Sequence, residues 1–278
     1  MDRRTLGDYR IEGIVGAGRM GVVYLATDPA GRKVALKVLR EDVEIDPVYR
    51  ERFRREGRML AALEHPNVIP ILGMGEVDGL LYIATRLTAN TLRDLIVAGP
   101  IAVDDAISIL AAVADALDAA HAAGVIHRDV KPANVLMDPG PRVYLTDFGL
   151  ARDPAGFALT APGQVLGTVD YMAPELLEGV RIGPATDIYA LACLAVETLT
   201  GQVPFPRDND AAVTYAHVMG APPSVAERRP ELPVALDEVI ATGMAKAAGD
   251  RPATAGTLIA DMLRALDRPL PAGLVATG

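Results

Sequence analysis

The sequence predicts an α+β fold with two lobes of different class, a smaller β-rich one followed by a larger helical one. Strand-like runs fill the first third of the chain, and helix-like runs fill the remainder. Glycines and turn residues separate the runs of the first third. Half of the 278 residues are hydrophobic, which is enough for the core of one bilobal domain.

The first lobe is predicted to contain five strands and one main helix. The runs YRIEGIVGAG, MGVVYLATD and GRKVALKVLR within residues 9–40 carry the apolar and β-branched pattern of strands, and a turn at 29–31 separates the last two. Residues 47–63 predict a charged amphipathic helix. Two more strands are expected on either side of the Asp78–Gly79 turn.

The second lobe is predicted to be helical. Helix-like periodicity covers residues 91–98, 104–123, 186–200, 208–218, 235–247 and 254–267. The final stretch, RPLPAGLVATG, is rich in proline, glycine and small residues, so we expect a linker or a frayed end there.

The charge of the chain argues against general nucleic-acid binding. Its net charge is −9, whereas proteins that bind nucleic acid need basic patches against phosphate. The local basic run RERFRREGR at 50–58 is better explained as the solvated face of a helix.

Other classes of site and location are also disfavoured. The single cysteine, Cys193, lies in an apolar run and is expected to be a small buried hydrophobe, and the four histidines show no ligand spacing. The N-terminus lacks the apolar core of a signal peptide, and no apolar run reaches the length of about 18 residues that a membrane span needs. A cytoplasmic protein without a membrane span is the simplest interpretation.

A glycine-rich stretch, VGAGRMGVVY, places Gly16, Gly18 and Gly21 in a G-x-G-x-x-G-x-V pattern that Val23 closes. Glycines let a backbone approach phosphates closely and adopt positive φ. A dinucleotide-binding fold uses the same spacing, but there the glycines lead into a helix, whereas a strand follows Gly21 here. The pattern indicates a strand–turn–strand flap over a nucleotide, and a glycine-rich hairpin of no special role stays open.

A lysine and a glutamate form a second candidate pair. Lys37, in VALKVL, should point to the strand face opposite Leu36 and Val38. Glu56 in the following helix could hold that lysine toward the α- and β-phosphates of a nucleotide. The alternatives are a surface lysine and ordinary charge patterning along the helix.

The stretch HRDVKPANVLMD, residues 127–138, concentrates charged and amide groups directly after an apolar helix. Asp129 and Asn134 are five residues apart with Lys131 between them, and Asp147 follows in YLTDFGLA. Phosphoryl transfer from ATP needs a carboxylate to orient the attacking hydroxyl, oxygen ligands for Mg²⁺ and a cation near the moving group. These four residues are of those types, although an ordinary solvated loop would also be polar.

At this point the sequence resembles the eukaryotic-like, Hanks-type serine/threonine protein kinases of bacteria. The resemblance rests on the glycine-rich loop, VALK, the helix glutamate, HRDVKPAN, DFG and APE in order, and it continues through TDIYALACLAVETLTGQVPF and GDRPATA. It implies the bilobal protein-kinase fold over residues 9–267, with an N-lobe at about 9–87, a C-lobe at about 88–267 and a tail at 268–278.

The resemblance implies roles for individual residues. Asp129 would be the catalytic base, Lys131 marks the serine/threonine class, and Asn134 and Asp147 would hold Mg²⁺, for which Mn²⁺ can substitute. Lys37 would contact the phosphates of ATP and pair with Glu56. The remaining nucleotide contacts would come from the glycine-rich loop, a residue near the adenine, the gatekeeper and the hinge, namely Val15, Gly16, Ala17, Gly18, Arg19, Met20, Gly21, Val22, Val23, Ala35, Thr85, Arg86, Leu87 and Thr88.

The resemblance also implies structural supports. A spine linking the lobes would contain Leu60, Ile71, His127 and Phe148. Glu175 would pair with Arg251, and Asp187 would anchor the catalytic loop from the helix beneath it. The hinge region YIATRLTANTL departs from the usual pattern, because it is one residue short and carries Arg86 where an acidic residue is common.

Control by phosphorylation is a further expectation. Arg128 would meet a phosphorylated residue of the activation loop, and Thr160 is the favoured autophosphorylation site. Many bacterial relatives carry a second threonine two positions later, where this chain has Pro162. Thr168 would contact Asp129 and Lys131 in the substrate pocket.

Two other classes of function compete with an active protein kinase. A pseudokinase scaffold usually lacks the lysine, the catalytic aspartate or the metal aspartate, and here Lys37, Asp129 and Asp147 are all present. A small-molecule phosphotransferase generally lacks the APE segment found here.

The partners expected are ATP and protein substrates, with no nucleic acid. The resemblance also allows a homodimer and a longer, membrane-anchored parent protein.

Overall fold

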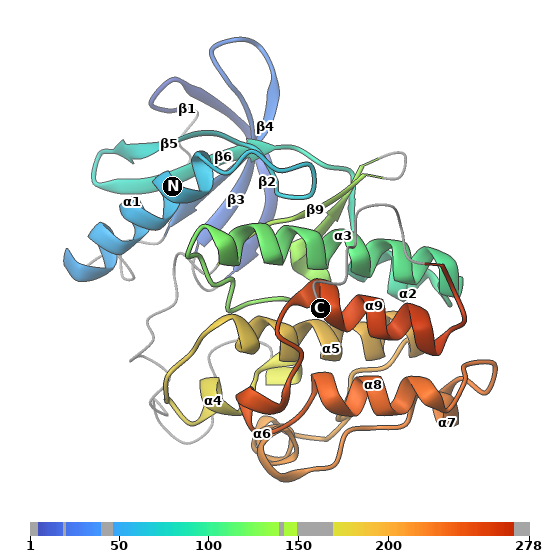
Figure 1. The fold of residues 1–278 in the computed structure, drawn as a ribbon. Helices are drawn as coiled ribbons and strands as arrows, with labels where there is room; N and C mark the ends of the chain where they lie inside the picture. Colours follow the sequence, from blue (N-terminus) through green and yellow to red (C-terminus); the bar gives the residue numbers. More distant parts are fainter. Residues whose placement is uncertain (1–4, 19–20, 40–46, 139–141, 149–168, 270–278) are drawn as a thin grey trace. The chain divides into compact units, whose positions relative to one another are not determined.

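A computed structural model describes residues 5–18, 21–39, 47–138, 142–148 and 169–269 (Figure 1). The chain divides into two compact units, Met1–Ala89 and Asn90–Gly278, which are described separately below. Several residues singled out in the sequence lie outside the described residues: Arg19, Met20, Gly149, Thr160, Pro162, Thr168 and, as a side chain, Glu56.

The first unit contains an antiparallel sheet of six strands in the order β1-β2-β3-β4-β6-β5. The five predicted strands are present, and the short β1 is an addition. The strands are β1 (Thr5–Leu6), β2 (Tyr9–Gly18), β3 (Gly21–Thr27), β4 (Lys33–Leu39), β5 (Ile71–Val77) and β6 (Leu80–Arg86).

Two sequence signals explain how this sheet is built. In β4, Val34, Leu36 and Val38 are buried and alternate with less buried residues, as a strand with one face on the core requires. Between β5 and β6 the predicted turn is present, and both Asp78 (φ 51°) and Gly79 (φ 82°) have left-handed backbone. Two-residue hairpin loops favour this conformation, which Asp-Gly sequences adopt readily.

Helix α1 (Pro47–Ala61) packs against β5 in the first unit. Among its described side chains, Phe53 and Leu60 are the large buried ones. Arg54, Arg55 and Arg58 are exposed, as the charge pattern predicts, whereas Arg50 is only partly exposed and lies against Glu76 of β5. The helix ends two residues before the predicted boundary.

The second unit is mainly helical, with α5 at its centre (Figure 1). All of α5 from Thr186 to Leu199 is buried, and it contacts α3, α8 and α9. This explains its apolar sequence, since a helix covered on all sides needs no polar face. The helices are α2 (Leu92–Ala98), α3 (Val103–Ala122), α4 (Pro174–Leu177), α5 (Pro184–Thr200), α6 (Asp210–Met219), α7 (Val225–Arg228), α8 (Ala235–Gly243) and α9 (Ala255–Ala265).

The predicted boundary of one helix is wrong. The sequence predicts a helix to residue 247, but α8 ends at Gly243. The i→i−4 ladder ends when the N–H of Met244 donates to the Ile240 carbonyl at 2.8 Å, and the next N–H, of Ala245, donates only three residues back, to the Thr242 carbonyl at 3.1 Å. The carbonyls of Ala245 and Lys246, in the turn that follows, accept hydrogen bonds from the Arg251 side chain at 2.8 and 3.1 Å.

A small sheet of three strands in the second unit was not predicted. It consists of β7 (Asn90–Thr91), β8 (Val135–Met137) and β9 (Val143–Leu145), in the order β7-β8-β9. Strands of two or three residues are too short to show a periodic pattern. This sheet matters because β8 and β9 carry candidate site residues at their ends.

The core of the second unit includes Cys193, which is fully buried. Burial raises the pKa of its thiol, which confirms the prediction of a small hydrophobe rather than a nucleophile. Among the helices that the structure describes, none combines the length and apolar character needed to cross a bilayer.

Candidate active site

The loop that follows α3 is held by one buried carboxylate on α5. Asp187 accepts hydrogen bonds from the backbone N–H groups of His127, at 2.8 Å, and Arg128, at 2.7 Å. Arg128 has left-handed backbone (φ 65°), a conformation that costs energy for a residue other than glycine. The two bonds hold the loop in this shape, so Asp187 is the anchor that the resemblance implies.

A third group contacts the same carboxylate. The Nε2 atom of His121, in the last turn of α3, lies 2.7 Å from Asp187 Oδ2. Sequence reasoning missed this residue. The only available signal was that His121 lies six residues before His127. That spacing does not show that the His121 side chain contacts Asp187, which is 66 residues further along the chain on α5.

His127 is a buried structural support beneath the loop. Its Nδ1 accepts the backbone N–H of Asp129 at 3.2 Å, so its Nε2 carries the proton and donates to the carbonyl of Thr146 at 2.9 Å. Burial lowers the pKa of His127, in agreement with this neutral form. Its ring lies 4.5 Å from that of Phe148, so these two predicted spine members are in contact.

The polar side chains of the loop converge on Asp129. Lys131 Nζ donates to Asp129 Oδ2 at 2.8 Å, and Asn134 Nδ2 donates to the same oxygen at 3.0 Å and to the Asp129 carbonyl at 2.7 Å. The side chains of Asp129 and Lys131 retain 16% and 20% of their exposure, so a ligand can reach them. The arrangement presents a carboxylate and a cation side by side, which an ordinary solvated loop would not fix.

The small sheet brings Asn134 and Asp147 to one place. Asn134 directly precedes β8, Asp147 lies just beyond β9, and Val135 pairs with Leu145 in the antiparallel ladder. The backbone N–H of Thr146 also donates to the Asn134 carbonyl at 3.0 Å. Asp147 has left-handed backbone (φ 57°), a second strained residue at the site.

These residues fit a divalent metal shared with phosphates. The Asn134 amide nitrogen is used within the loop, so its oxygen is the atom that can ligate, and Asp147 offers a carboxylate. Within the described ranges, no group of three or more His, Cys, Asp or Glu side chains could hold a metal by itself. A metal here would need oxygens from its nucleotide as well.

Other candidates lie in the first unit and are described there by themselves. Lys37 pairs with Ile83 across β4 and β6, and Ala35 pairs with Thr85. By strand alternation Lys37 and Ala35 share the face opposite Leu36, as the sequence predicts. Arg86 ends β6, and Leu87 and Thr88 follow it without regular structure.

The glycine-rich stretch forms the ends of β2 and β3. Neither Gly16 nor Gly21 has positive φ, so left-handed backbone is not the reason for glycine at these two positions. At Gly21 the reason for glycine is close packing, because a Cβ would lie 2.3 Å from the Val38 carbonyl oxygen. At Gly16 a Cβ would meet no atom within 4 Å, and Val15 beside it is 57% exposed.

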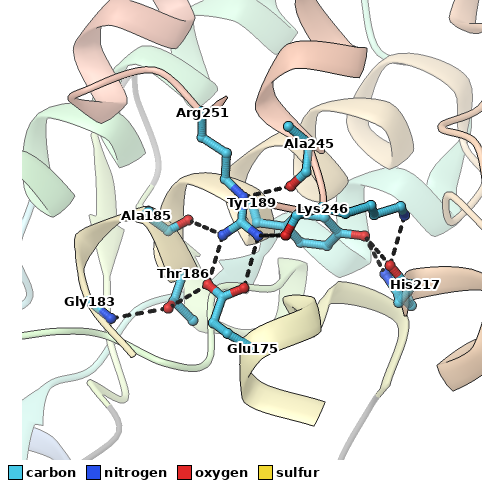
Figure 2. A network of polar contacts seen from close by, with 9 residues as sticks. All are labelled: Glu175, Gly183, Ala185, Thr186, Tyr189, His217, Ala245, Lys246 and Arg251. Atoms are coloured by element: carbon cyan, nitrogen blue, oxygen red, sulfur yellow. Dashed lines mark hydrogen bonds and ion pairs between the residues drawn. The ribbon is translucent and has the colours of Figure 1, made fainter. Parts of the chain in front are cut away.

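A separate buried network supports the second unit (Figure 2). The guanidinium of Arg251 binds both carboxylate oxygens of Glu175, at 2.7 and 2.8 Å, which confirms the pair that the resemblance implies. Its other N–H groups donate to the carbonyls of Ala185, Ala245 and Lys246. All five donors of this arginine are therefore used.

The carboxylate of this pair is charged despite its burial. Burial alone would raise the pKa of Glu175, but the hydrogen bonds and charge of Arg251 outweigh it and lower the pKa overall. Thr186 also donates its hydroxyl to Glu175 at 2.8 Å. The network ties the APE segment to α5 and to the turn before α9.

Comparisons with known proteins agree with this geometry. The family model for the protein kinase domain matches residues 9–265. The chain is 41% identical over 266 residues to the serine/threonine-protein kinase PknH of Mycobacterium bovis, covering 95% of this chain and 45% of that protein. It is 44% identical over 260 residues to the serine/threonine-protein kinase PknE of Mycobacterium tuberculosis, covering 91% of this chain and 45% of that protein.

A solved kinase-domain structure has the same fold as this chain. The crystal structure of the M. tuberculosis PknI kinase domain matches with a TM-score of 0.77 and 32% identity, covering 94% of this chain and 96% of that one. The chain spans less than half the length of the curated relatives PknH and PknE.

Proposed function

Because the chain belongs to the protein kinase family, we propose that it transfers the γ-phosphoryl group of ATP to serine and threonine hydroxyls of proteins. The observation that carries this proposal is the contact of Lys131 Nζ with Asp129 Oδ2 at 2.8 Å, on a loop anchored by Asp187. A phosphoryl acceptor needs such a carboxylate, and the moving phosphoryl group needs such a cation.

The polar residues of the site then have distinct roles. Asp129 orients the attacking hydroxyl and accepts its proton, and Lys131 stabilises the charge that develops on the transferred group. Asn134 holds Asp129 in place through its amide nitrogen and, with Asp147, offers oxygen ligands for Mg²⁺. When bound, the metal would neutralise charge on the phosphates.

The first unit supplies the remaining nucleotide contacts in this proposal. Lys37, paired with Glu56, would contact the α- and β-phosphates. The segment from Val15 to Val23 would cover the phosphates, and Ala35 would lie near the adenine. Backbone groups of the hinge at 86–88 would bind the adenine edge, so the unusual Arg86 should affect inhibitor preference more than ATP binding.

The identity of the phosphorylated product tests the proposal. The protein with Mg²⁺–ATP should phosphorylate serine and threonine in generic protein substrates and leave tyrosine and small alcohols unmodified. EDTA should abolish the transfer. Transfer to a small alcohol alone would favour a small-molecule phosphotransferase, and nucleotide binding without any transfer would favour a scaffold.

Autophosphorylation at Thr160 is part of the proposal. A phosphate there would pair with Arg128, which directly precedes the catalytic aspartate. Mass spectrometry after incubation with ATP should find Thr160 modified, and Thr160→Ala should lower activity toward substrates. An active enzyme whose Thr160 stays unmodified would exclude this site.

A further inference from the structure

Helix α1 packs on the sheet of the first unit through a narrow apolar stripe. Among the side chains of α1 that the structure describes, the buried positions Phe53, Gly57 and Leu60 follow this single stripe. The middle position is a glycine, which provides no side chain and lowers helix propensity. A Cβ at Gly57 would lie 2.4 Å from Met74 Cε, so the helix approaches β5 closely and the Met74 side chain lies against a smooth backbone there.

Two arginines of α1 clamp the helix to one carboxylate of β5. Arg50 Nη2 lies 2.6 Å from Glu76 Oε1, and Arg54 Nη2 lies 2.7 Å from Glu76 Oε2. Arg50 also donates to the carbonyl of Gly79, in the turn after β5, at 3.3 Å. The hydrogen bonds from Arg54 and Arg50 hold the pKa of Glu76 below its usual value, so this carboxylate is charged at neutral pH.

The clamp lies on one side of the helix. Counting about 100° per residue, positions 50 and 54 fall on one flank of the buried stripe and position 56 falls on the other. Rotation of the helix about its axis would therefore carry position 56 toward or away from the sheet. The glycine at the centre of the stripe has no side chain to interlock with β5, so the two ion pairs on one flank are the directional contacts that oppose this rotation.

We propose that Glu76 is a positioning residue that fixes the rotation of α1 through Arg50 and Arg54, and thereby sets where Glu56 stands relative to Lys37. This inference rests on the proposed kinase function, in which that pair must be in place for transfer. Neither Glu76 nor its two arginines would touch the nucleotide.

The test compares Glu76→Gln with a matched control in the same unit. Glu12 is also an exposed carboxylate paired with two basic side chains, Arg10 and Lys33, but it joins strands and does not contact α1. Glu76→Gln should lower kcat at saturating ATP about three- to tenfold, since each partly exposed ion pair makes a small contribution. Glu12→Gln should leave kcat unchanged within twofold, and the melting temperatures of the two variants should be similar.

Two further measurements separate positioning from general stability. Amide hydrogen exchange over residues 47–61 should quicken in Glu76→Gln and not in Glu12→Gln. The double variant Arg50→Gln/Arg54→Gln should lose as much activity as Glu76→Gln, and adding Glu76→Gln to it should cause no further loss.

The outcomes of these experiments distinguish the positioning role of Glu76 from the proposed kinase function. If the wild type transfers phosphate and Glu76→Gln matches Glu12→Gln in kcat and in exchange of α1, the positioning role is overturned and the proposed function stands. An additive loss in the triple variant would also overturn it. If the wild type transfers nothing, the proposed function fails, and the clamp is reduced to a structural contact.

Discussion

At the scale of single residues, the candidate site depends on backbone groups as much as on side chains. Asp187 is fully buried and uses both carboxylate oxygens to hold consecutive N–H groups of the loop, at His127 and Arg128. The strain of Arg128 is sustained by these bonds. Asp129 therefore takes its position from a residue 58 positions later in the chain.

We expect Asp187→Asn to damage this arrangement. An amide can accept from one of the two N–H groups, and its NH₂ group would then face another donor. The substitution should lower the free energy of unfolding by about 2–4 kcal/mol and reduce phosphoryl transfer at least tenfold. Urea unfolding and initial rates measure the two effects.

Asp261→Asn is the matched control, because Asp261 forms only a partly exposed pair with Arg264 on α9. Its free energy of unfolding should stay within about 0.5 kcal/mol of wild type. Equal unfolding free energies for the two variants would show that Asp187 does not hold the loop.

The sequence predicts the residue types at the site better than their contacts. Asp129, Lys131, Asn134 and Asp147 stand out because few residue types suit phosphoryl transfer. The contact of His121 with Asp187 was missed, because it depends on how α3 packs against α5. The reason for Gly21 was also missed, because only the structure shows the carbonyl of Val38 beside it.

At the scale of elements, buried polar contacts join helices that are distant in sequence. Figure 2 shows Arg251 and Glu175 on one side of Tyr189, and His217 with Lys246 near the tyrosine hydroxyl. The Arg251 guanidinium stacks 4.9 Å from the Tyr189 ring, and Lys246 donates to the carbonyl of His217 at 2.7 Å. The network thereby connects α4, α5 and α6 with the turn before α9.

Arg251→Lys should be strongly destabilising although it keeps the charge. A lysine has three donors in place of five and cannot bind both carboxylate oxygens of Glu175 as a planar fork. We expect a loss of about 2–4 kcal/mol in the free energy of unfolding, measured by urea denaturation. Arg264→Lys, on the exposed pair with Asp261, should change it by less than about 0.5 kcal/mol; a loss as large as that of Arg251→Lys would contradict this account.

His217 should make the second unit sensitive to acid. Burial, followed by the charge of Lys246, lowers its pKa from 6.5 to about 4. Below pH 6.5 the unfolded chain therefore binds a proton that the folded chain does not, and stability falls as the pH drops from 6.5 toward 4. The contribution is at most about 1.4 kcal/mol per pH unit, or about 3 kcal/mol in total.

Chemical denaturation at several pH values measures this effect. His217→Gln should be less stable at pH 7, since Tyr189 loses its imidazole partner at 2.9 Å, but its stability should fall less steeply between pH 6.5 and 4. Buried His127 contributes in the same direction in both proteins, so the difference in slope isolates His217. Parallel slopes would rule out His217 as the acid-sensitive group.

Element prediction succeeded where periodic patterns were long. The six predicted helices of the second unit and the five predicted strands are all present near their predicted ranges, apart from the end of α8, because runs of seven or more residues show a clear period. The strands β7, β8 and β9 and the four-residue helices α4 and α7 were missed, since they are too short to show a period. The predicted end of α8 was wrong, because the turn that places the carbonyls of Ala245 and Lys246 beside Arg251 is a tertiary feature that local periodicity does not show.

At the scale of the whole molecule, the order of motifs carried more information than composition. Composition and charge excluded classes of function, but the two-lobed α+β fold followed from the change of pattern near residue 90, where the two compact units also divide. The family followed from six short motifs in order, and a family model over 9–265 supports it.

The measurement that tests the central claim most directly is the initial rate of phosphoryl transfer from Mg²⁺–ATP to a threonine substrate, for wild type and Asp129→Asn at equal concentrations. Asp129→Asn should keep the melting temperature and lose at least about a hundredfold in rate, because general base catalysis contributes about that much or more. Asp261→Asn should transfer phosphate as fast as the wild type. A rate for Asp129→Asn within threefold of the wild type would contradict the assignment of this loop as the catalytic centre.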